Sequence, residues 1–197
     1  LEGARQHVEL TEKWLRGGLE SPEIAAECRP GQFIMVTVAE TIDPLLRRPM
    51  AVYRILRGDD GAPRGFSMMV EVVGRGTALL EQKEAGDHLR VLGPLGVPFS
   101  MPETSPDSGA ASPAERGEQL LVMGGVGSAP FPFFAEQLRS QGFRVRAFVG
   151  ARTAEALLCV DDFEEMGIPV EVSTDDGTQG YHGFVVGPLE EYLDRHG

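Results

Sequence analysis

The sequence predicts two small domains, an antiparallel β-barrel or sandwich followed by a parallel α/β domain. Within the first hundred residues, short apolar runs alternate with turn residues, which is typical of antiparallel strands. A stretch at 101–119 has almost no large apolar residue and indicates a linker. After it, strand-like and helix-like runs alternate, which predicts a parallel sheet. We therefore expect domains at 1–100 and 120–197.

Four apolar runs predict the strands of the first domain. They are Gly31–Val38, Pro49–Leu56, Phe66–Val73 and Leu89–Leu92. Turn residues bound these runs, as expected of short strands. A helical turn is expected at Thr77–Gln82.

The second domain is expected to alternate strands with helices. The predicted strands are Leu120–Met123, Arg144–Val149 and Pro169–Ser173, and the predicted helices are Pro130–Arg139, Thr153–Phe163 and Leu189–Asp194. In the first of these helices, Phe131, Phe134 and Leu138 are expected on one apolar face. The linker at 101–119 has an alternative interpretation as an ordered insertion packed on the surface.

Composition excludes several classes of protein. The net charge of −12 argues against nucleic acid as a partner, because the surface repels phosphates. No apolar run approaches the roughly 18 residues of a membrane helix, and the mixed, charged N-terminus is unlike a signal peptide. Only two cysteines are present, Cys28 and Cys159, which favours a reducing, cytoplasmic setting with both thiols buried as small apolar groups.

A glycine-rich turn joins a buried strand to a helix at Gly124, Gly125 and Gly127. Glycines permit a tight turn, and the free N–H groups at a helix start attract a pyrophosphate. The full dinucleotide fingerprint fails twice: Pro130 replaces its third glycine, and Arg152 lies near the next strand end without an acidic residue. A plain strand-to-helix turn remains the alternative.

Two further segments of the first domain have features of anion sites. Arg47 and Arg48 precede a strand, where a fixed guanidinium can clamp a phosphate. Gly74, Gly76 and Thr77 follow another strand, where small residues expose backbone N–H groups. Solvated surface arginines and a simple turn are the alternatives.

A fourth motif follows the third parallel strand. Asp175 and Asp176 precede Gly177 at the carboxyl end of that strand, where open α/β sheets bind ligands. The alternative is an ordinary Asp-Gly turn.

The order and spacing of these motifs resemble the ferredoxin-reductase superfamily. The succession reads GQF, RRP, VVGRGT, LGPLG, GGVGSAP, GART and DDGTQGYHG. Within the superfamily it is most similar to the electron-transfer subunits of class B dihydroorotate dehydrogenases. The likeness runs from about Val8 to the last residue and is interrupted at 101–119.

The resemblance implies an FAD-binding barrel and an NAD-binding α/β domain. Its cofactor-binding residues would be Arg48, Pro49, Met50, Ala51, Met69, Val70, Glu71, Gly74, Gly76, Thr77, Gly124, Gly125, Gly127, Asp175 and Asp176. Arg48, Gly76 and Thr77 would bind the FAD pyrophosphate, and the segment Met69–Glu71 would flank the flavin. Gly124, Gly125 and Gly127 would face the nicotinamide nucleotide, with the two aspartates bordering it. No side chain is assigned a catalytic or metal-binding role.

Three departures from the family pattern affect what the resemblance implies. Ala51 stands where the family has Ser or Thr, whose hydroxyl would hydrogen-bond the flavin near N5, so flavin reduction should be slower or retuned. Glu71 places a carboxylate where a basic or neutral residue is common. The family continues into a [2Fe–2S] segment with four cysteines, whereas this chain has none after Cys159. We therefore expect a C-terminally incomplete or shortened relative.

The expected function is that of an oxidoreductase subunit. FAD would exchange a hydride with NADH, and electrons would pass between this subunit and a dihydroorotate dehydrogenase catalytic subunit in a hetero-oligomer of pyrimidine biosynthesis. The alternatives are a flavin reductase subunit of a hydrogenase, sulfide-type reductase or oxygenase, or a non-catalytic nucleotide-binding paralogue. The choice between NADH and NADPH stays open, because Arg152 could reach a 2′-phosphate.

Overall fold

The computed structural model describes residues 4–10, 14–39, 46–102 and 117–196. The chain forms two compact units, Leu1–Phe99 and Ser100–Gly197. No helix in the described part of the chain combines the length and the apolar character that crossing a membrane requires.

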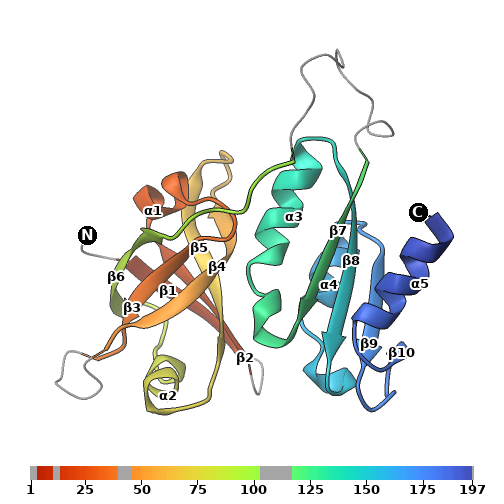
Figure 1. The fold of residues 1–197 in the computed structure, drawn as a ribbon. Coiled ribbons are helices and arrows are strands. Elements are labelled where there is room, and N and C mark those ends of the chain that lie inside the picture. The colour runs from red at the N-terminus through yellow and green to blue at the C-terminus, as the bar shows by residue number, and fades with distance from the viewer. Residues whose placement is uncertain (1–3, 11–13, 40–45, 103–116, 197) are drawn as a thin grey trace. The chain divides into compact units, whose positions relative to one another are not determined.

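The first unit is a closed antiparallel barrel with two short helices (Figure 1). Its elements are β1 (Ala4–Leu10), β2 (Trp14–Glu20), α1 (Pro22–Glu27), β3 (Phe33–Thr37), β4 (Arg48–Arg57), β5 (Pro63–Glu71), α2 (Arg75–Glu81) and β6 (His88–Leu95). The strand order is β1-β2-β5-β4-β3-β6, and β1 also pairs with β6, which closes the ring. The predicted barrel is confirmed, and each of the four predicted strands overlaps an observed one.

Alternating side chains fill the barrel. In β3, Ile34 and Val36 are fully buried while their neighbours are half-buried, as a strand with one face on a core requires. Phe66 and Val52 contribute fully buried side chains from β5 and β4. Sequence analysis did not predict β1, β2 or α1.

A buried amide explains why the GQF and LGPLG motifs are neighbours in space. The Gln32 Oε1 accepts the Arg29 N–H at 2.9 Å, and its Nε2 donates to the Gly96 carbonyl at 3.0 Å. Gly31 has φ +86°, and a Cβ there would lie 2.8 Å from the Phe99 ring. Only glycine satisfies both the backbone conformation and the close approach.

The second unit is a four-stranded sheet with helices on both sides (Figure 1). Its elements are β7 (Glu118–Gly124), the 3₁₀ turn η1 (Gly125–Ser128), α3 (Phe131–Ser140), β8 (Arg144–Ala151), η2 (Ala154–Ala156), α4 (Val160–Glu165), β9 (Val170–Thr174), β10 (Tyr181–His182) and α5 (Val186–His196). All pairings in the order β10-β9-β8-β7 are parallel, which confirms the predicted parallel sheet.

Several predicted boundaries in this unit were wrong. The helix expected at Thr153–Phe163 is broken into η2 and α4, because Cys159 adopts the left-handed conformation (φ +65°) before α4. β7 already includes Glu118 and Gln119, which were assigned to the linker. Residues 103–116 of that predicted linker lie outside the described part of the chain.

The predicted apolar face of α3 was partly wrong. Phe133 and Leu138 are buried, whereas Phe131 and Phe134 are only half-buried. Four consecutive apolar residues, from 131 to 134, leave the buried face ambiguous in the sequence. Packing within the folded unit decides it.

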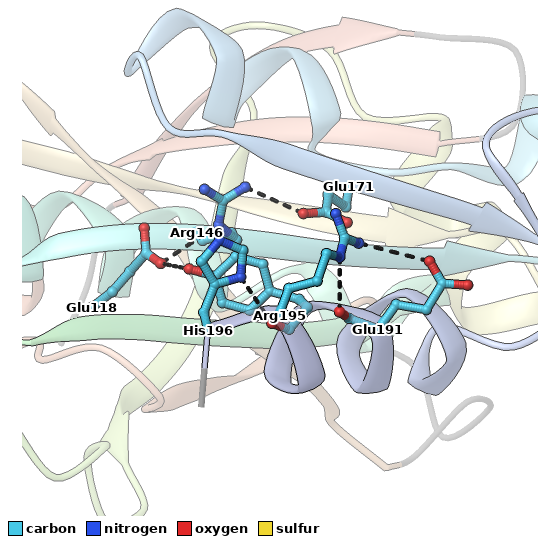
Figure 2. Close-up of polar contacts among 7 residues, drawn as sticks. Glu118, Arg146, Glu171, Glu191, Arg195 and His196 are labelled. Atoms are coloured by element: carbon cyan, nitrogen blue, oxygen red, sulfur yellow. Dashed lines mark hydrogen bonds and ion pairs between the residues drawn. The ribbon is translucent and has the colours of Figure 1, made fainter.

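A charged and aromatic cluster fixes α5 to the sheet (Figure 2). Arg146 on β8 lies 3.5 Å from the Glu118 carboxylate and 3.2 Å from that of Glu171, on the two neighbouring strands. Its guanidinium carbon lies 4.6 Å from the centre of the Tyr192 ring, a cation–π contact. The Tyr192 hydroxyl donates to Glu118, which raises the pKa of Tyr192. His196 stacks on Tyr192 at the end of the helix.

Candidate functional site

Arg48 and Gly76, from two different sequence motifs, meet in the barrel unit. Arg48 begins β4, and Gly76 lies in the first turn of α2. The Arg48 Nη1 donates to the Leu46 carbonyl at 2.6 Å. A Cβ placed on Gly76 would lie 2.5 Å from the Arg48 Nε and 2.8 Å from its Nη2. The guanidinium therefore lies directly against the backbone of the VVGRGT turn.

The Thr77 hydroxyl holds this turn together. Its Oγ1 accepts the backbone N–H of Val73 at 3.0 Å and that of Gly74 at 3.2 Å, and it donates to the Gly74 carbonyl at 3.0 Å. The side chain is buried, so the hydroxyl is committed to the turn. In this arrangement Thr77 shapes the loop, and its hydroxyl uses its hydrogen bonds within the loop.

β4 and β5 part beside this turn. Their pairing ends at Val52 and Met68. Beyond that point, Arg48–Ala51 pairs with β3, and Met69–Glu71 pairs with β2. The two segments that the resemblance assigns to the flavin thus form the facing edges of this parting. Beyond Val52 and Met68, these edges are not paired with each other.

The side chains of these edge segments differ in exposure. Met50, Met69 and Val70 are buried in the barrel, Ala51 and Glu71 are half-buried, and Pro49 is exposed. Of these six side chains only that of Glu71 is charged, so the backbone supplies the other polar groups along the two edges.

The three glycines at the end of β7 and in the turn after it have different surroundings. A Cβ on Gly124 would lie 3.2 Å from the Gly150 carbonyl oxygen, so β8 approaches closely there. Gly125 has φ +53°, a conformation that favours glycine. A Cβ on Gly127 would meet no atom within 4 Å. Nothing in the described structure requires glycine at Gly127, which leaves room for a ligand there.

The two aspartates after β9 have different surroundings. The Asp176 Oδ1 accepts both the N–H (3.0 Å) and the hydroxyl (2.7 Å) of Thr178, and these hydrogen bonds lower the pKa of Asp176. The Thr178 Oγ1 also accepts the Ala154 N–H at 2.9 Å, which ties this loop to the one after β8. Asp175 is exposed, and its N–H donates to the Ala151 carbonyl.

The parallel topology brings these loops to one edge. β7, β8 and β9 end at Gly124, Ala151 and Thr174, and the loops that follow lie at the carboxyl edge of the sheet. Sequence reasoning missed two buried hydroxyls near that edge, Ser128 and Ser173, whose Oγ atoms have no hydrogen-bond partner within the structure described. Small polar residues at the end of an apolar strand were the available signal.

The predicted site residues separate into two groups, one in each unit. Arg48 to Thr77 belong to the barrel, and Gly124 to Asp176 belong to the α/β unit. Both cysteines are buried, which confirms that prediction, and burial raises the pKa of Cys28 to about 11. Among the described residues, no group of three or more His, Cys, Asp or Glu side chains is placed to hold a metal ion.

Solved structures share the fold of both units. One is an NADH-dependent reduced ferredoxin–NADP oxidoreductase, with a TM-score of 0.75 and 30% identity, covering 99% of this chain and 64% of that one. Another is a ferredoxin–NADP⁺ reductase from Neisseria gonorrhoeae with bound FAD and NADP, with a TM-score of 0.73, 20% identity, and coverage of 99% and 78%. The chain therefore has the ferredoxin-reductase fold.

Curated proteins of similar sequence identify the relatives of this chain more closely than the fold does. No protein-family model matches. The electron transfer subunit of dihydroorotate dehydrogenase B (NAD(+)) from Desulforamulus reducens is 36% identical over 176 residues, covering 89% of this chain and 61% of the relative. That from Geobacillus kaustophilus is 38% identical over 162 residues, covering 82% and 58%. The chain is a homologue of these electron transfer subunits and spans about 60% of their length.

Proposed function

We propose that this chain is the FAD-containing part of an electron-transfer subunit. It would pass electrons between NAD(H) and a partner dihydroorotate dehydrogenase in pyrimidine biosynthesis. The observation that carries the proposal is the contact of Arg48 with Gly76 beside the parting of β4 and β5. Homology to the electron transfer subunits supports the choice of partner.

The barrel site suits the two chemically different halves of FAD. The Arg48 guanidinium is a fork of donors that matches a diphosphate. The facing backbone edges of Arg48–Ala51 and Met69–Glu71 suit the hydrogen-bonding rim of a flat ring, with buried Met69 and Val70 behind one edge. An FAD site requires a cationic group for the diphosphate next to unpaired strand edges for the ring. Arg48 and the separated strands β4 and β5 would meet these two requirements.

The carboxyl edge of the parallel sheet suits a nicotinamide nucleotide. Gly125 and Gly127 leave open space beside the turn after β7, so backbone N–H groups there are accessible to a pyrophosphate. Asp175 and Asp176 border the same edge, where the hydrogen bonds of Asp176 fix the loop. Open α/β sheets bind their ligands at this edge.

The chain itself supplies binding and orientation. When bound, FAD and NADH provide the hydride and electron chemistry. Arg48 would neutralise phosphate charge, and the β4 backbone would orient the ring. Ala51 offers only its backbone where a hydroxyl is common among ferredoxin reductases. We therefore expect slow flavin reduction by this chain.

The residues of this chain do not fit an iron–sulfur cluster. A [2Fe–2S] centre takes four thiolate ligands, whereas the chain has two cysteines, both buried. We assign no electron-transfer step to a cluster held by these residues.

The first test is an absorbance spectrum of the purified protein, followed by anaerobic addition of NADH or NADPH. A flavin band that bleaches with NADH is the expected result. A protein that takes up no FAD from solution would overturn the proposal. Bound FAD that neither nucleotide reduces would favour a non-catalytic nucleotide-binding protein, a possibility supported by Ala51.

The partner is tested separately by mixing the flavin-loaded protein with the dihydroorotate dehydrogenase catalytic subunit of the same organism. Co-elution as one complex in size-exclusion chromatography is expected. Intact FAD binding without co-elution would direct the search to hydrogenase, sulfide-type reductase or oxygenase partners.

A further inference from the structure

The backbone conformation at position 76 does not explain why the residue there is glycine. It is absent from the residues with positive φ, so an L-amino acid could adopt its conformation. It lies in the first turn of α2, where alanine is a better helix former than glycine. The space around it must therefore decide.

That space is filled by Arg48. A Cβ on Gly76 would lie 2.5 Å from the Arg48 Nε, 2.8 Å from Nη2 and 2.9 Å from Cζ. These separations are shorter than van der Waals contact, so a Cβ at position 76 and the guanidinium in its present place exclude each other. On its other side the guanidinium is held by the Leu46 carbonyl, 2.6 Å from Nη1. The guanidinium thus donates to the Leu46 carbonyl on one side and lies against Gly76 on the other, in space that a side chain at position 76 would fill.

We propose that Gly76 is a positioning residue that acts through Arg48. It gives the guanidinium a fixed place and so preorganises its donors for a diphosphate, instead of making room for the phosphate itself. The inference rests on the proposed function, because it takes FAD as the ligand of Arg48. It differs from the role implied by the family resemblance, in which Gly76 binds the pyrophosphate directly.

The physical consequence of Gly76→Ala follows from which atoms must move. The clashing atoms are the far end of a flexible side chain, so Arg48 can swing away at little cost to the fold. Alanine in α2 does not weaken the helix. The loss is the fixed orientation of the guanidinium, and a group that must be ordered on binding lowers affinity.

The test is a double-mutant cycle on FAD affinity, measured by quenching of flavin fluorescence on titration into apoprotein. We expect Arg48→Ala to raise the Kd by roughly 30-fold, as for loss of hydrogen bonds to a charged group. Gly76→Ala alone should raise it by about 5- to 10-fold. In the Arg48→Ala background, Gly76→Ala should change it by less than about 2-fold, because the group it displaces is already gone. If Arg48→Ala binds too weakly for the fluorescence titration, the two variants that contain it are compared by equilibrium dialysis at higher FAD concentration.

Gly74→Ala is the matched control. A Cβ on Gly74 would meet no atom within 4 Å and would leave Arg48 in place. Whatever its effect on Kd, it should multiply with that of Arg48→Ala. The Tm of Gly76→Ala should stay within about 2 °C of wild type or rise.

The outcomes separate the two proposals. Wild-type protein that binds no FAD overturns the proposed function. Wild-type binding combined with the same fold-change for Gly76→Ala in both backgrounds overturns this inference and leaves the function standing. A large fall in Tm for Gly76→Ala would also overturn the inference, since the glycine would then serve the fold.

Discussion

The candidate sites in the two units are built from different kinds of groups. In the barrel unit, the charged side chain of Arg48 is held between a carbonyl and Gly76. In the α/β unit, the turn after β7 offers glycine backbone, and the nearby side chains that carry charge include Asp175 and Asp176. Ligand affinity at the first site should therefore depend on the charge and orientation of the Arg48 guanidinium. Ligand affinity at the second site should depend on the open space and the backbone geometry of the turn after β7.

The largest expected effect tests the role of space in the α/β unit. Gly127→Leu fills a region where a Cβ meets no protein atom, so the fold should be unaffected. If a nucleotide uses that region, kcat/KM for NADH should fall about 100-fold, or about 2.7 kcal/mol. Stopped-flow measurement of flavin bleaching checks this, and FAD affinity should be unchanged. Unaltered kcat/KM would place the nucleotide elsewhere.

The next effect concerns stability of the α/β unit away from its glycine turn. Arg146→Ala removes the cation between Glu118 and Glu171, leaving two partly buried carboxylates without the cation that they share. We expect a loss of about 2 kcal/mol in the free energy of unfolding, measured by urea titration. The KM for NADH should not change.

Arg195 provides the control for that prediction. It pairs with Glu191 on the surface of α5, and its side chain is 61% exposed. Arg195→Ala should cost less than about 0.5 kcal/mol. Equal effects of the two substitutions would show that the cluster around Tyr192 does not stabilise the unit.

Salt should affect the two sites in opposite directions. Raising ionic strength screens the repulsion of both anionic ligands by a chain of net charge −12, and at the FAD site it also screens the local attraction of Arg48, which we expect to be the larger effect there. Between 20 and 200 mM salt we expect the Kd for FAD to rise and the KM for NADH to fall, each by about 2- to 3-fold. In Arg48→Ala the rise in Kd should disappear. Shifts of the same sign would remove the distinction between the sites.

The last effect is a pH dependence in the barrel unit, confined to alkaline pH. The pKa of the Cys28 thiol is raised to about 11 by burial, against about 8.5 in an unfolded chain. Below pH 8.5 both states are protonated and stability is fully present. Between pH 8.5 and 11 the unfolded chain loses its proton first, so stability should fall as pH rises. Urea titrations of wild type and Cys28→Ala across this range measure it, and equal slopes would contradict it.

Predictability from the sequence followed the strength of the local signal. β3, β4 and β8 have strongly apolar sequences, and their positions were predicted to within a few residues. β2 contains Gly17 and Gly18 and has weak strand character, so its place depends on pairing with β1 and β5. The predicted helix Thr153–Phe163 is interrupted by the left-handed backbone at Cys159, which could not be predicted because cysteine has no preference for that conformation.

The candidate site residues showed the same division. Glycine turns, the arginine pair and the Asp-Gly loop could be recognised because each has an unusual local composition. Their grouping could not, since Arg48 and Gly76 lie 28 positions apart and meet only through strand pairing. The Thr77 hydroxyl illustrates the limit, because three hydrogen bonds commit it to its own turn.

The sequence by itself determined the two-part architecture, the parallel pairing in the second sheet and the glycine, arginine and aspartate motifs that we propose as anion sites, because these depend on local periodicity and residue type. Only the tertiary structure decided where β4 and β5 part, which glycine leaves space and which is filled by a neighbour, and which aspartate is engaged by its loop. Those features arise from contacts between residues distant in sequence, and such contacts exist only after the chain has folded.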